Sequence, residues 1–82
     1  MDNRNKAKII CEGLQLVFPS YVGYEYENTE FNIINISLYT LENKRTVEKI
    51  IKFNFDNILD INKHHKKDSR GMNQYLLRFK DE

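Results

Sequence analysis

Residues 6–18, with the sequence KAKIICEGLQLVF, constrain the fold most, because they carry a helical repeat that stops at a proline. Asn3 or Asn5 can cap the start of such a helix, and Pro19 ends it, since the residue before a proline avoids the helical conformation. The alternative is a pair of short strands that turn at Glu12-Gly13. At roughly 100° per residue, one broad face gathers the apolar side chains Ala7, Ile10, Cys11, Leu14, Val17 and Phe18.

This predicted helix is apolar on a second side as well. Ile9 and Leu16 lie seven residues apart and roughly opposite the centre of the main apolar face. A helix that is apolar over most of its circumference is buried on more than one side. We therefore expect either the chain's own loops or another molecule to cover Ile9 and Leu16.

From residue 21 onward the apolar spacing changes to two, which is typical of strands. The segment 31–41 and the segment 46–55 alternate β-branched and aromatic residues around a polar turn at 42–45, which favours a hairpin of two central strands. Residues 72–80 predict a last strand. A short helix over 57–66, capped by Asp56 and followed by Gly71, is expected between them.

The expected fold is therefore α+β. The N-terminal helix packs on an antiparallel sheet of about four strands, and the short helix precedes the last strand. An all-β fold with an N-terminal hairpin is the alternative. A chain of 82 residues is expected to form one domain, spanning 1–82.

Composition limits the setting in which such a domain works. The single cysteine rules out an intrachain disulfide, and no apolar run approaches the roughly 20 residues that span a bilayer. The first residues show no signal-peptide pattern. We expect a soluble, cytoplasmic protein with no membrane contact. Abundant Asn, Ile and Lys indicate an AT-rich coding sequence, which favours a low-GC bacterium or one of its phages.

Residues that could carry catalysis or hold a metal are scarce. His64 and His65 are adjacent, whereas two helical metal ligands need a spacing of three or four, and no further His or Cys completes a site. Cys11 lies on the apolar helical face, where a thiol is usually inert. The three glycines are scattered, so no phosphate-binding loop exists. We expect no enzyme, no cofactor and no metal.

Two small regions of opposite charge remain as candidates for binding. Residues 62–71 hold four bases against Asp68, a net +3, and residues 21–30 hold three glutamates and no base, a net −3. Alternating tyrosine and glutamate suits a protein interface. The favoured hypothesis is a non-enzymatic protein-binding module, a small regulator or inhibitor that acts by surface occlusion and forms a homodimer. Its predicted binding residues are Tyr24, Glu25, Tyr26, Glu27, Ile9 and Leu16.

The alternative hypothesis is nucleic-acid binding through the basic segment 62–70 and the expected hairpin at 44–52. Against it, the net charge is only +1, and no signature of a known nucleic-acid-binding fold is present. The residues that would contact phosphates are Lys63, His64, Lys66, Lys67, Arg70, Lys44 and Arg45.

Overall fold

The computed structural model describes residues 3–18, 21–23 and 33–80 and has an α+β fold. Its elements, in chain order, are α1 (Asn3–Val17), β1 (Tyr21–Val22), β2 (Ile33–Thr40), α2 (Lys44–Asn54), β3 (Ile58–Lys63) and β4 (Asn73–Lys80). The strands form one antiparallel sheet in the order β1-β2-β4-β3. Because β1 has only two residues, the other three strands make up most of the sheet.

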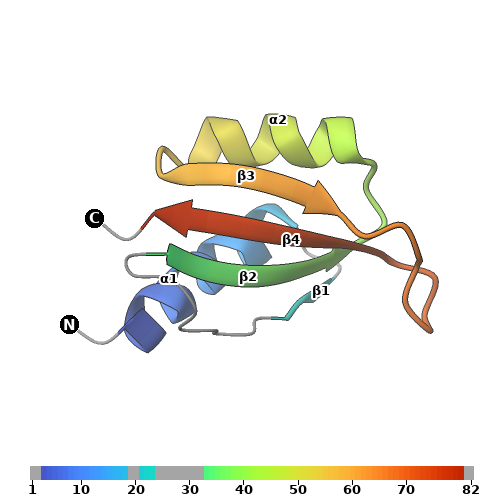
Figure 1. Ribbon diagram of the computed structural model, residues 1–82, viewed down its shortest axis with the longest axis horizontal. Helices are drawn as coiled ribbons and strands as arrows, with labels where there is room; N and C mark the ends of the chain where they lie inside the picture. The colour runs from blue at the N-terminus through green and yellow to red at the C-terminus, as the bar shows by residue number, and fades with distance from the viewer. Residues whose placement is uncertain (1–2, 19–20, 24–32, 81–82) are drawn as a thin grey trace.

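Both helices cover the same face of this sheet. In Figure 1, α1 crosses behind β2 and β4, and α2 lies beside β3. The register pairs Ile34 with Phe79 and Ile36 with Leu77. Alternate residues of β2 and β4 therefore lie on the face of the sheet that the helices cover. One core includes these residues and the inward side chains of both helices: Ala7, Ile10, Cys11, Leu14, Phe18, Ile34, Ile36, Leu38, Val47, Ile51, Tyr75, Leu77 and Phe79.

The prediction of an N-terminal helix on an antiparallel sheet is confirmed. Helix α1 ends at Val17, two residues before Pro19 in the sequence. Gly13 of α1 lies against the residue that follows α2, since a Cβ at this position would stand 3.3 Å from the Phe55 ring. Phe55 in turn packs edge-on against Phe79, with ring centroids 5.5 Å apart.

The strand predicted at 46–55 is wrong, because these residues lie in α2. Their apolar residues also fit a helical repeat, in which Val47 and Ile51 share the buried side. The Asn43 side chain caps the helix and accepts a hydrogen bond of 2.9 Å from the Thr46 N–H. The Asn43 cap and the burial of Val47 and Ile51 together favour the helix over a strand. The hairpin predicted around 42–45 does not form.

The helix predicted over 57–66 is also wrong, because Ile58–Lys63 form strand β3. The pairing of β3 with β4 shifts between Ile58 and Asp60, which makes Leu59 an extra residue, a β-bulge. Ile58 and Ile61 both face the core across this bulge, a spacing of three. That spacing imitates a helical repeat in the sequence.

The turn between β2 and α2 is held to the start of β4. The Tyr75 hydroxyl donates a hydrogen bond of 2.7 Å to the Glu42 carbonyl, and the Asn73 side-chain amide donates to the same oxygen at 3.1 Å. Burial raises the pKa of Tyr75, and the nearby Glu42 carboxylate adds to this effect. Among the described residues, no helix is long and apolar enough to cross a membrane.

Candidate protein-binding surfaces

The outer side of α1 carries two exposed aliphatic side chains. Ile9 is 63% exposed and Leu16 is 86% exposed, whereas Leu14, on the opposite side of the helix, is fully buried. The sequence predicted that Ile9 and Leu16 lie away from the core, and the structure confirms this placement. Their role in binding stays a prediction.

The outer side of α2 adds an aromatic ring. Phe53 is 89% exposed, although Val47 and Ile51 on the same helix are fully buried. Sequence reasoning missed Phe53, because a strand at 46–55 would place it on the same face as Val47 and Ile51. A helical repeat would have found it, since Phe53 then falls beside Ile50 and Thr46 rather than toward the core.

A hollow lies between the end of α1 and the start of α2. Its apolar lining comes from Val17 and Phe18, from Ile50, and from Leu41, which is 68% exposed. Four of the six exposed large hydrophobic residues in the described part of the chain therefore belong to the helical side of the molecule. We call Ile9, Leu16, Leu41 and Phe53 the helical surface.

The predicted acidic edge cannot be placed. Tyr24, Glu25, Tyr26 and Glu27 lie outside the described residues. The hypothesis that they bind a partner therefore remains a prediction from the sequence.

The structure brings the two basic segments of the nucleic-acid hypothesis to one end of the sheet. Strands β2 and β3 flank β4 and run parallel to each other, so the segments that follow them leave the sheet at the same end. In Figure 1, the loop between β3 and β4 extends from the end at which α2 begins. We call this end of the sheet the basic end. It carries exposed lysine and arginine side chains from both segments: Lys44, Arg45, Lys63, Lys66, Lys67 and Arg70.

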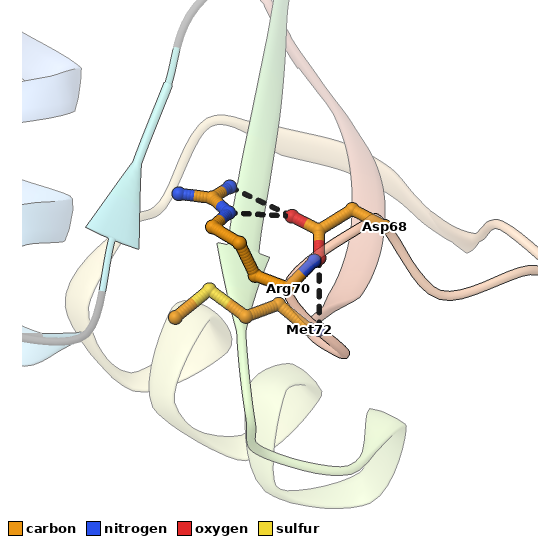
Figure 2. A network of polar contacts seen from close by, with 3 residues as sticks. All are labelled: Asp68, Arg70 and Met72. Carbon is orange, nitrogen blue, oxygen red and sulfur yellow. Dashed lines mark hydrogen bonds and ion pairs between the residues drawn. The ribbon is translucent and has the colours of Figure 1, made fainter.

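The loop between β3 and β4 contains a turn that is stabilised by the carboxylate of Asp68. Asp68 accepts 2.9 Å hydrogen bonds from the Arg70 and Met72 N–H groups, and its other oxygen lies 2.7 Å from the Arg70 guanidinium (Figure 2). Burial acts to raise the pKa of Asp68, but these donors outweigh it and hold the pKa below its usual range. The guanidinium also lies 5.5 Å from the centre of the Tyr39 ring.

The two histidines lie in this loop and not at a helix end. Their rings stack with centroids 4.8 Å apart, and His64 Nδ1 accepts a hydrogen bond of 3.2 Å from the Lys66 N–H. The two carboxylates nearest in sequence already have partners, since Asp60 pairs with Arg78 at 3.1 Å and Asp68 pairs with Arg70. In the described ranges, no three metal-ligating side chains come together.

Cys11 is poorly suited to nucleophilic chemistry. It is buried in the core, and this burial raises the pKa of its thiol to about 11. The reactive form of the thiol is therefore scarce near neutral pH, and the side chain packs as a small apolar group.

Compared with known proteins, the chain matches no family model, and no curated protein or solved structure is significantly similar to it.

Proposed function

We propose that this chain is a non-enzymatic protein-binding domain that attaches to a partner protein through the helical surface. The observation that carries the proposal is the exposure of Leu16 and Phe53, at 86% and 89%, on two helices whose inward sides are fully buried. Such a domain would act as a small regulator that covers a functional surface of its partner.

The grouping of these side chains supports binding more than their number does. Single exposed hydrophobic residues are normal on protein surfaces, but a contiguous apolar patch marks an interaction site. Here the residues come from α1, α2 and the turn before α2, and one of them, Leu41, lines the hollow between the end of α1 and the start of α2. Large side chains of this kind, and aromatic ones above all, are the anchors that supply most of the binding energy at protein interfaces.

A second copy of the chain is one candidate partner. The net charge of +1 produces little repulsion between copies, and two helical surfaces could pack symmetrically. Sedimentation velocity over a wide range of concentrations tests this homodimer. A monomer at every concentration excludes the second copy and leaves a different protein as the partner.

Affinity capture with matched variants tests the proposal itself. We expect the double variant Leu16→Glu/Phe53→Glu to fold, because both side chains are exposed, and to lose the proteins that the wild type captures from its native host. Leu76→Glu is the control, since Leu76 is 44% exposed on the opposite face of the sheet. Retention of the same proteins by both variants, or no captured protein and no self-association, would refute the proposal.

Nucleic-acid binding is the second candidate, because two basic segments meet at one end of the sheet. A salt-graded mobility shift with single-stranded and duplex probes tests it. If the basic end binds phosphates, Lys44/Lys63/Lys66/Lys67→Ala should weaken binding and flatten the salt dependence by about 0.9 in log–log slope for each lost contact. An unchanged shift, or no shift by the wild type, removes this candidate.

A further inference from the structure

The face of the sheet opposite the helices, the outer face, has planar side chains at the basic end. The register pairs Tyr39 of β2 with Gln74 of β4, and the His64 N–H donates a hydrogen bond of 2.8 Å to the Gln74 carbonyl. The three residues therefore form one row across the sheet. The next row, with Leu38 and Tyr75, is buried under the helices, and successive residues of a strand point to opposite faces. The row of Tyr39, Gln74 and His64 thus belongs to the outer face.

On one side of this row, Arg70 supplies a flat cationic group. Its guanidinium lies 5.5 Å from the centre of the Tyr39 ring. Asp68 holds the guanidinium in place, because one carboxylate oxygen accepts hydrogen bonds of 3.0 Å from Nε and 2.7 Å from Nη2 of Arg70 (Figure 2). The Arg70 side chain is still 48% exposed, so an incoming planar group can stack on it.

On the other side of the row, two imidazole rings form a second flat surface. The His64 and His65 rings are stacked, with centroids 4.8 Å apart and an angle of 13° between their planes. The Nδ1 atom of His64 accepts a hydrogen bond of 3.2 Å from the Lys66 N–H, which orients the ring at the start of the loop. Both histidines are exposed. Each ring has one face that the other does not cover, so a further planar group can extend the stack.

The charge beside these planar groups is positive. Lys66 and Lys67 are exposed in the loop that also carries the histidines and Arg70. Asp68 is the one acid among residues 62–71, against four bases, and it is paired with Arg70 at 2.7 Å. This segment therefore has a net charge of +3, in a chain whose net charge is only +1.

Beyond the row, the outer face carries an apolar side chain and then a neutral ion pair. Leu76 is 44% exposed and lies two residues along β4 from Gln74, on the same face. Asp60 and Arg78 pair at 3.1 Å farther from the basic end. The outer face thus combines flat and apolar groups with positive charge at its basic end. Proteins that bind unpaired bases together with their phosphates use this combination.

We propose that this end of the outer face binds single-stranded nucleic acid, with unpaired bases stacked on Arg70 and on the two histidines. The proposal rests on the second candidate function, nucleic-acid binding at the basic end, and names the form of nucleic acid. The Gln74 amide lies between the two stacking groups, where it can donate to and accept from the edge of a base. Lys66 and Lys67 contact the phosphates. We call Tyr39, His64, His65, Arg70 and Gln74 the stacking surface.

A duplex and an acidic peptide fit this surface less well. The bases of a duplex are stacked on one another and present only their edges in the grooves, so the planar side chains would have no ring to stack on. An acidic peptide would meet the lysines of the loop and leave the planar groups unused. Both therefore serve as comparison ligands.

Fluorescence polarisation with labelled oligonucleotides of about ten nucleotides tests the proposal. The probe is oligo-dT, and its control is an abasic strand with the same number of phosphates. We expect the probe to bind at least about tenfold more tightly than the abasic strand, and more tightly than a duplex or polyglutamate. Equal binding of probe and abasic strand, or tighter binding of the duplex or polyglutamate, would overturn the proposal. Equal binding of the two strands would leave the second candidate function intact, whereas no binding of any nucleic acid would refute both.

Substitutions in the loop separate stacking from charge. His64→Ala/His65→Ala should weaken oligo-dT binding about fivefold or more and leave the abasic strand unaffected. His64→Phe/His65→Phe also loses the Nδ1 hydrogen bond but keeps flat rings, so it should retain the affinity for oligo-dT. Lys66→Ala/Lys67→Ala should weaken both ligands and reduce the log–log salt slope by about 0.7 for each lost contact. An alanine pair at 64 and 65 that binds oligo-dT as the wild type does would contradict stacking on the histidines.

Two further variants locate the site. Arg70→Lys keeps the charge and removes the flat group, and we expect it to weaken oligo-dT binding about two- to fivefold. The stacking surface shares no residue with the helical surface, so Leu16→Glu/Phe53→Glu should bind oligo-dT with wild-type affinity. In NMR titrations, the ring protons of both histidines should shift upfield when bases stack on them. Unmoved histidine signals at saturation, or loss of binding in the Leu16→Glu/Phe53→Glu variant, would overturn the proposal.

Discussion

Helix α1 and the loop between β3 and β4 are held in place by different interactions. Helix α1 is fixed by burial, with Leu14 and Ala7 fully buried against the sheet. The loop is exposed, and its turn depends on a few hydrogen bonds to Asp68 and on the unusual backbone of Gly71. Ile9 and Leu16 thus lie on a rigid element. The basic side chains of the loop lie on a segment that is held by local hydrogen bonds, each of which is weak.

The largest expected effect separates the two sides of α1. Leu14→Ala should lower the free energy of unfolding by about 2–5 kcal/mol, because it leaves a cavity in the core. Leu16→Ala should change it by no more than about 0.5 kcal/mol, because this side chain touches little of the protein. Urea unfolding followed by circular dichroism measures both. Similar losses for the two variants would show that Leu16 packs within the chain.

Alkaline pH tests the burial that fixes α1. Burial raises the pKa of Cys11 from 9.0 to about 11. The neutral thiol therefore favours the folded state, and its contribution is complete below pH 9 and is lost as the pH rises toward 11. The loss is about 2–3 kcal/mol, at 1.36 kcal/mol for each pKa unit.

Cys11→Ala is the matched control for this pH effect, since it keeps every other group that titrates in the same range. The wild type should lose more stability than Cys11→Ala between about pH 8 and pH 11, by the amount that the shifted pKa gives. Parallel stability curves for the two proteins would contradict a buried thiol in the core.

The loop should respond to a change of backbone and not of packing. Gly71 has a φ of 81°, and a Cβ at this position would meet no atom within 4 Å. Gly71→Ala should therefore cost about 1–2 kcal/mol, from backbone conformation alone. Thermal unfolding measures the loss. A variant as stable as the wild type would mean that the turn adopts another conformation at little cost.

The smallest expected effect on global stability comes from Asp68→Asn. This change removes the charge that pairs with Arg70 and weakens acceptance from the Met72 N–H. Hydrogen exchange at Arg70 and Met72 should become faster, while exchange in α1 stays the same. A drop in pH below the lowered pKa of Asp68 should have a similar effect, because protonation removes the same charge. Faster exchange throughout the chain would contradict a local role.

The sequence predicted well where one period dominates. Helix α1 follows from a long run with apolar residues on one face and a proline at its end, and β4 follows from strict alternation. The strand predicted at 46–55 is wrong because the apolar spacing of these residues fits both periods, and the Asn43 cap favours the helix. The helix predicted at 57–66 is wrong because a bulge shifts the strand alternation by one residue. The bulge depends on the pairing with β4, which the local sequence does not show.

The candidate surfaces were predictable in part for the same reason. The exposure of Ile9 and Leu16 followed from the helical repeat. The exposure of Phe53 follows only from a helical repeat, because a strand at 46–55 places its side chain on the same face as Val47 and Ile51. The meeting of two basic segments at one end depends on strand order, which local spacing does not reveal.

Site-specific photo-crosslinking in the native host tests the binding role of the helical surface most directly. A benzophenone side chain in place of Leu16 or Phe53 should yield the same cross-linked protein from both positions, because both belong to one surface. The same group in place of Leu76, on the opposite face of the sheet, should yield none of it. Cross-linking at Leu76 as strong as at Phe53, or no product from either helix, would contradict the account.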